Sequence, residues 1–268
     1  MFAPTNVEAI INYSTHDADR PQIYATDYSR NRAAFSPHRM TIHNASFNLD
    51  RPDVDREGFA LVHAPTKVTD FEDQDQRAQL YVPELEAVLK QLTGADDVIA
   101  LGLGELRRGT KTPPEQRGNS NLPVPFAHID ASDSGIVTLL DYGFPDRPRH
   151  ARRWAFYNIW RALSPGPLDE PLAICDARSV SPMDLRPYDS HFPQGVTLES
   201  LMPCYNPAHR WCYFRDMGRD DLLIFKTNES DPTRAHHVLH TAFEDPTAPA
   251  SAPPRVSLEL RAYAYWLD

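Results

Sequence analysis

The chain has 268 residues, a length that suits one large domain or two small ones. Its apolar fraction of 41% and mean hydropathy of −0.51 predict a globular protein, and no apolar run approaches the length of a membrane span. The net charge of −10 disfavours contact with nucleic acid and with anionic membrane surfaces. We therefore expect neither as a partner.

The cysteines and the N-terminus indicate the compartment. Cys175, Cys204 and Cys212 are odd in number and show no CxxC spacing, which predicts reduced thiols. The first twenty residues lack the basic-then-apolar pattern of a signal peptide. We therefore expect a cytoplasmic protein, and the sequence leaves a homodimer open.

The first 120 residues mix strands with one helix. Alternating side chains predict a strand over residues 39–50, and residues 56–68 read as a strand that leads into a loop. Apolar residues at helical spacing predict a helix over residues 78–94, which ends at a glycine. Residues 96–108 return to a strand pattern.

After residue 120 the chain becomes rich in short aromatic and β-branched runs with turn residues between them, which predicts strands. These runs cover residues 152–163, 171–180, 197–206, 209–217, 220–228, 235–243 and 255–266. The pattern favours a jelly roll or β-barrel in a single domain spanning residues 1–268. In this domain, residues 1–120 would form a mixed α/β part packed on the barrel, and residues 121–268 would form the core.

One short motif in the second half has the chemistry of a metal site. Residues 127–132 read AHIDAS, which places His128 one residue from Asp130. Chance alone would give roughly 1.5 such triplets in a chain with 11 His and 37 Asp plus Glu, so its surroundings must decide. His240 lies on a late predicted strand, and Arg255 and Ser257 form an Arg-x-Ser after it.

The order of these residues matches the needs of a non-haem iron centre. Two histidines and one carboxylate hold Fe(II) on one face and leave positions open for a co-substrate and oxygen. If the co-substrate is 2-oxoglutarate, its distal carboxylate needs a forked cation, which Arg255 provides beside the hydroxyl of Ser257. Arg261 lies on the same strand face and is the alternative anchor, unless it pairs with Glu259.

Two further positions stay open at this point. His236 would share a strand face with His240, so spacing alone does not exclude it as the ligand. Asn158 lies among aromatic residues on a predicted barrel strand, where it is a candidate contact to the co-substrate or the substrate. Lys226, at the end of another predicted strand, is expected to be solvated.

Most of the chain resembles a family of Fe(II)- and 2-oxoglutarate-dependent hydroxylases and desaturases of microbial secondary metabolism. The family includes the fungal gibberellin desaturase and a component of the cephamycin methoxylase system. The resemblance is carried by an ordered series of blocks: FNLDRPDVDREGF, LTGADDV, AHID, YNIWRAL, PLAICDARSV, YNPAHRWCYF, DLLIFK, HTAFEDP and PPRVSLELRA. The chain departs from the family after HID, where ASDSG replaces a QTPEGA-like segment that we expect at the pocket mouth.

The resemblance implies a mainly β fold with flanking helices, the double-stranded β-helix. It implies a dioxygenase that uses Fe(II), 2-oxoglutarate and O2 to hydroxylate or desaturate a small organic substrate. The HTAF block singles out His240 as the distal ligand beside His128 and Asp130. Two alternatives remain: a cupin-like metalloenzyme that does not use 2-oxoglutarate, and a non-catalytic partner subunit of a biosynthetic oxygenase complex.

Overall fold

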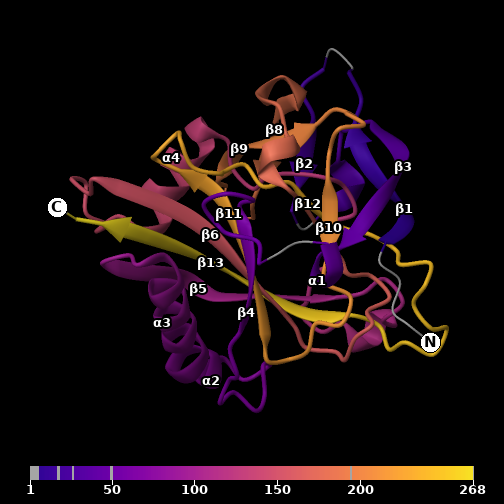
Figure 1. The fold of residues 1–268 in the computed structure, drawn as a ribbon, viewed down its shortest axis with the longest axis horizontal. Helices are drawn as coiled ribbons and strands as arrows, with labels where there is room; N and C mark the ends of the chain where they lie inside the picture. The colour runs from indigo at the N-terminus through magenta and orange to yellow at the C-terminus, as the bar shows by residue number, and fades with distance from the viewer. Residues whose placement is uncertain (1–5, 17–18, 26, 49–50, 194, 268) are drawn as a thin grey trace.

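The computed structural model describes residues 6–16, 19–25, 27–48, 51–193 and 195–267. In these ranges the strands form two five-stranded sheets and one three-stranded sheet (Figure 1). The mainly β architecture with flanking helices is therefore confirmed. None of the helices in the described ranges is long and apolar enough to cross a membrane.

The sheet with the longer strands, here called the major sheet, is antiparallel throughout. In spatial order its strands are β4 (Phe59–His63), β11 (Asp221–Glu229), β6 (Arg153–Ala162), β13 (Val256–Trp266) and β5 (Asp97–Arg108). The pairing of β13 with β5 shifts register between Glu259 and Arg261. This irregularity lies beside the predicted site.

The second five-stranded sheet, the minor sheet, contains one parallel pair, between β3 and β10. In spatial order its strands are β1 (Asn6–Ser14), β3 (Phe35–Asn44), β10 (Trp211–Tyr213), β7 (Leu172–Cys175) and β12 (His240–Ala242). The third sheet is formed by β2 (Gln22–Tyr24), β8 (Leu185–His191) and β9 (Thr197–Pro203). Strands from before residue 120 therefore belong to all three sheets, while the domain division expected there stays a prediction.

The two longer helices lie outside the sheets, one beside β5 and the other beside β9 (Figure 1). A π-helical turn (Arg77–Tyr81) leads into α3 (Val82–Thr93), and Gly94 ends α3 in the left-handed conformation, which confirms the predicted helix. The remaining α-helices are α1 (Ala45–Asn48), α2 (Gln74–Gln76) and α4 (Asp133–Gly143). Short 3-10 turns cover Tyr28–Arg30, Pro114–Gln116, Ala177–Ser179 and Pro182–Asp184.

The alternation of side chains along β6 explains the two faces of the major sheet. Tyr157 and Ile159 pack with Leu85 and Leu89 of α3, which covers the outer face. Trp160 instead packs between the two main sheets with residues of β7 and β10. Asn158 shares this inner face, as predicted, and this alternation turns its amide towards the barrel interior.

Several sequence predictions of local structure are wrong. The strands expected over residues 171–180 and 209–217 are limited to β7 and β10. The strand expected over residues 39–50 ends at Asn44, where α1 begins, and residues 49–50 lie outside the described residues. The strand expected over residues 235–243 is limited to β12, because His237 has a φ of 56° and interrupts the extended backbone. Helix α4 was not predicted, although Ser132 caps its N-terminus by accepting a hydrogen bond from the Gly135 amide.

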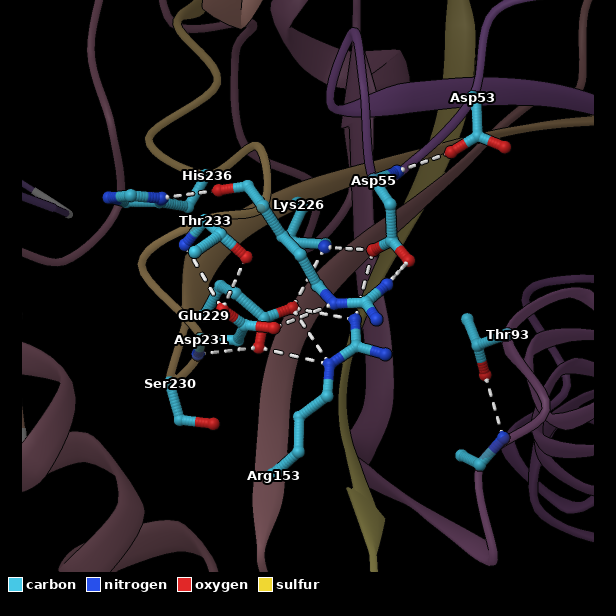
Figure 2. A network of polar contacts seen from close by, with 12 residues as sticks. Asp53, Asp55, Thr93, Arg153, Lys226, Glu229, Ser230, Asp231, Thr233 and His236 are labelled. Carbon is cyan, nitrogen blue, oxygen red and sulfur yellow. Dashed lines mark hydrogen bonds and ion pairs between the residues drawn. The ribbon is translucent and has the colours of Figure 1, made fainter.

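Lys226 is not a solvated strand end. Its side chain is 0% exposed, and Nζ donates to Asp55 Oδ1 at 2.5 Å and to Glu229 Oε2 at 2.9 Å. Arg153 contacts the same two carboxylates (Figure 2), and Arg234 pairs with the second oxygen of Asp55, Oδ2. This cluster joins β6, β11 and the loop before β4 to the segment that leads into β12.

We predict that Lys226→Met destabilises the protein by about 3–5 kcal/mol, because it leaves the carboxylate of Glu229 buried with less positive charge beside it. The matched control is Arg234→Ala, which removes a cation that is 37% exposed and should cost only about 0–1 kcal/mol. Urea unfolding of both variants checks this. Equal, small losses would show that the cluster does not behave as a buried ion-pair network.

Candidate metal centre and pocket

Three side chains from two segments converge inside the barrel. His128 and His240 face each other across an antiparallel bridge, with both backbone N–O distances at 3.1 Å. Asp130 Oδ1 lies 3.4 Å from His128 Nε2 and 3.7 Å from His240 Nε2. Within the described part of the chain, these residues form the one group of three or more His, Cys, Asp or Glu with metal-ligand spacing.

Backbone carbonyls set the tautomer of both histidines. His128 Nδ1 lies 3.0 Å from the carbonyl oxygen of Phe126, and His240 Nδ1 lies 3.3 Å from that of Val238. Because a carbonyl oxygen only accepts, each Nδ1 carries the proton and each Nε2 keeps its lone pair for a metal. Burial lowers the pKa of His240 to about 3, so this imidazole is neutral at physiological pH.

The two oxygens of Asp130 have different surroundings. Oδ1 faces the histidines, whereas Oδ2 accepts from Arg261 Nε at 2.7 Å and from Asn158 Nδ2 at 2.8 Å. Burial acts to raise the pKa of Asp130, but the charge of Arg261 and the contacts to the histidines hold that pKa well below its usual range. The carboxylate is therefore an anion with one oxygen directed at the metal position.

This donor set fits a non-haem Fe(II) ion. Two neutral imidazoles and one carboxylate supply three ligands, and this number leaves coordination positions for other molecules. The carbonyls of Phe126 and Val238 and the side chains of Asn158 and Arg261 form the second layer that usually orients such ligands.

Arg255 differs from the other arginines of the pocket. It is 2% exposed, its Nε donates to Ser257 Oγ at 3.0 Å, and its Nη1 donates to the carbonyl oxygen of Glu170 at 2.9 Å. Among the described residues, no carboxylate forms an ion pair with it, and burial followed by the nearby charge of Arg107 lowers its pKa to about 10. It remains a buried cation at neutral pH that lacks an anion, which fits the distal carboxylate of 2-oxoglutarate.

Arg261, the alternative anchor, is already paired. Besides Asp130 it contacts Glu259, with Nη2 to Oε1 at 3.0 Å, and both carboxylates raise its pKa against the effect of burial. The ion pair with Glu259 that the sequence suggested is therefore present. Asn158, its cross-strand partner, contacts Asp130 directly.

The metal ligands and Arg255 open into one cavity of about 950 Å³. Its apolar wall comes from the third sheet, α4 and the loop before His128. Leu139 and Tyr142 of α4 line it, whereas residues 131–135, the ASDSG segment expected at the pocket mouth, are not among its lining residues. Charged lining residues that the sequence analysis missed are Glu105, Arg107, Glu170 and Glu244, and no motif marks them.

The other histidines of the late segment lie outside the metal group. His236 Nδ1 contacts the carbonyl of Arg234 at 2.9 Å, and His237 Nε2 contacts Asp133 Oδ1 at 2.9 Å. The extended strand that would have aligned His236 with His240 is absent from this segment. The geometry therefore favours His240 over its neighbours.

Comparisons with known proteins agree with this geometry. A family model described as an oxidoreductase/YMDC permease-like domain matches residues 11–265. Hydroxylase/desaturase CTB9 of Cercospora beticola is 32% identical over 260 residues, which cover 88% of this chain and 79% of that protein. The Fe(II)/2-oxoglutarate-dependent dioxygenase nvfI of Aspergillus novofumigatus is 26% identical over 86% of this chain and 84% of its own length.

Among solved structures, the iron and alpha-ketoglutarate-dependent endoperoxidase NvfI matches with a TM-score of 0.82 at 21% identity, over 99% of this chain and 100% of that one. This likeness shows the fold and confirms the expected jelly roll. The comparisons also confirm an oxygenase with Fe(II), 2-oxoglutarate and O2, in preference to the two alternatives. The chain belongs to the Fe(II)- and 2-oxoglutarate-dependent dioxygenases, in the group that includes the fungal hydroxylase/desaturases.

Proposed function

We propose that His128, Asp130 and His240 hold the iron and that Arg255 binds the distal carboxylate of 2-oxoglutarate, so that the enzyme hydroxylates or desaturates a small organic compound. The observation that carries the proposal is the joint presence, in one cavity, of the metal triad and a buried arginine without a carboxylate partner. Iron bound there would supply the oxygen activation that this chemistry needs. The protein supplies the ligands, the anchor and a cavity that limits access of water.

The remaining site residues act on these groups. Ser257 accepts from Arg255 Nε and so fixes the plane of the guanidinium, rather than serving only as a contact to the co-substrate. Asn158, the candidate contact to the co-substrate or the substrate, and Arg261, the alternative anchor, are proposed to orient Asp130 through Oδ2. This division of roles predicts that Arg255 affects the binding of 2-oxoglutarate, whereas Arg261 affects the binding of iron.

We also propose a cytoplasmic location. Cys175, Cys204 and Cys212 are buried free thiols, which suits a reducing compartment. Burial raises the pKa of Cys212 to about 12, so this thiol stays protonated and unreactive. A homodimer stays a prediction.

Replacing either histidine of the triad with alanine should abolish stoichiometric Fe(II) binding, because each supplies one of only three protein donors. Anaerobic equilibrium dialysis of His128→Ala and His240→Ala checks this, with unchanged circular dichroism as evidence of folding. The control is His237→Ala, which should retain one iron per chain because His237 contacts Asp133 instead. Loss of iron in this control but not in His240→Ala would refute the ligand assignment.

Arg255→Ala should weaken 2-oxoglutarate binding by about 10- to 150-fold. The basis is a loss of roughly 1.5–3 kcal/mol for a hydrogen bond to a charged group, at about 1.4 kcal/mol per tenfold change. Anaerobic titration of the iron-loaded protein gives the dissociation constant. Arg107→Ala is the control, because Arg107 already pairs with Glu105 at 2.9 Å and should leave the constant near that of the wild type.

Asn158→Leu and Arg261→Met should each lower Fe(II) affinity by about 10- to 100-fold, as is typical when a group that orients a metal ligand is lost. At saturating iron, both variants should bind 2-oxoglutarate nearly as the wild type does. The opposite split, with normal iron affinity and weak 2-oxoglutarate binding for Arg261→Met, would make Arg261 the anchor.

A further inference from the structure

We propose that the substrate of this enzyme is a ring-bearing compound that carries no carboxylate, because the pocket selects against anions. The inference rests on the proposed function, because it assigns Arg255 to 2-oxoglutarate. It concerns the part of the cavity that the iron and the co-substrate leave free.

Two of the three arginines that line the cavity already pair with carboxylates. Arg107 pairs with Glu105, and Arg261 pairs with Asp130 and Glu259. Among the described residues that line the cavity, this leaves Arg255 as the arginine without a carboxylate partner. Once 2-oxoglutarate occupies it, a carboxylate on the substrate finds no cation to pair with.

Two further carboxylates strengthen this effect. Glu170 lines the cavity and is held by Thr110, with its backbone N at 2.6 Å and Oγ1 at 2.8 Å. Glu244 also lines the cavity and is exposed at its edge. Neither pairs with an arginine or lysine in the described part of the chain, so both add negative potential against an incoming anion.

Strand alternation keeps charge out of the far wall. On β8, Tyr188 and Ser190 line the cavity, whereas Asp189 between them points outward and pairs with Arg20. On β9, Leu198 lines the cavity, whereas Glu199 pairs with Arg20 on the outside. The lining residues contributed by β2, β8, β9 and α4 are therefore all uncharged.

The same wall is suited to rings. Phe35 and Phe126 stack with centroids 4.9 Å apart and planes at 19°, and Tyr188 meets Phe126 edge-on at 6.4 Å. Phe126 also lies 5.4 Å from the ring of His128, so the aromatic surface continues up to the metal ligands. Aromatic surfaces of this kind favour flat, apolar partners.

The test compares two probes of one ring system: 2-acetylnaphthalene and 2-naphthoate. The ketone and the carboxylate have nearly the same size and shape, and differ in charge. Anaerobic protein loaded with Fe(II) and saturating 2-oxoglutarate is dialysed against each probe. The charge-transfer absorption of the chelated 2-oxo acid is followed in parallel, so failure of the proposed function appears as a missing band and is distinguished from failure of this inference.

The neutral ketone should bind at least about tenfold more tightly than 2-naphthoate, because an unpaired carboxylate loses its hydration in the cavity. Val196→Lys places a cation on the wall and should bring 2-naphthoate to within about threefold of the ketone. Its control is Thr197→Lys, which adds the same charge at an exposed neighbouring position and should keep the wild-type preference. Equal or tighter binding of 2-naphthoate by the wild type, or equal shifts in the two lysine variants, would overturn the inference.

Discussion

The site depends on one shared carboxylate. Asp130 lies between two positive centres, the guanidinium of Arg261 on one side and the metal position on the other. Each oxygen serves one of them, so Arg261 and Asn158 hold Oδ2 and leave Oδ1 for the ion. A buried carboxylate without these donors would rotate or take up a proton, and the two histidines alone would bind iron poorly.

The fold builds this arrangement from positions far apart in the sequence. Asn158 and Arg261 are direct cross-strand partners on β6 and β13, and the register of that pair sets both donors beside Asp130. His240 arrives from the minor sheet, where its backbone bonds to His128. The metal site therefore forms where the two main sheets meet, which explains why it needs the whole barrel.

Much of this could be predicted from the sequence because it follows local rules. Side-chain alternation predicted the long strands, and Gly94 marked the end of α3. The spacing of His128 and Asp130, the Arg-x-Ser and the family resemblance together indicated the residues that we propose as ligands and anchor. Each of these features lies within a short stretch of the sequence, so each could be recognised without knowledge of tertiary contacts.

The errors concern residues whose surroundings come from distant segments. Nothing near Lys226 in the sequence indicates that its side chain will pair with Asp55. Likewise, nothing near Arg261 indicates that its guanidinium will pair with Asp130. The strand expected before His240 is interrupted at His237, whose backbone is left-handed. The His237 backbone N–H donates a hydrogen bond to the carbonyl oxygen of Thr227, which helps to hold this conformation. Sequence patterns do not show which charged residues far apart in the chain will pair. Nor do they show where tertiary contacts force a local change in backbone conformation.

The most direct test of the account is a crystal structure of the anaerobic protein with Fe(II) and 2-oxoglutarate. We predict one iron bound by His128 Nε2, His240 Nε2 and Oδ1 of Asp130 alone, with Oδ2 still held by Arg261 and the distal carboxylate of 2-oxoglutarate on Arg255. Iron held by both oxygens of Asp130, or a distal carboxylate on Arg261, would contradict the division of roles on which the account depends.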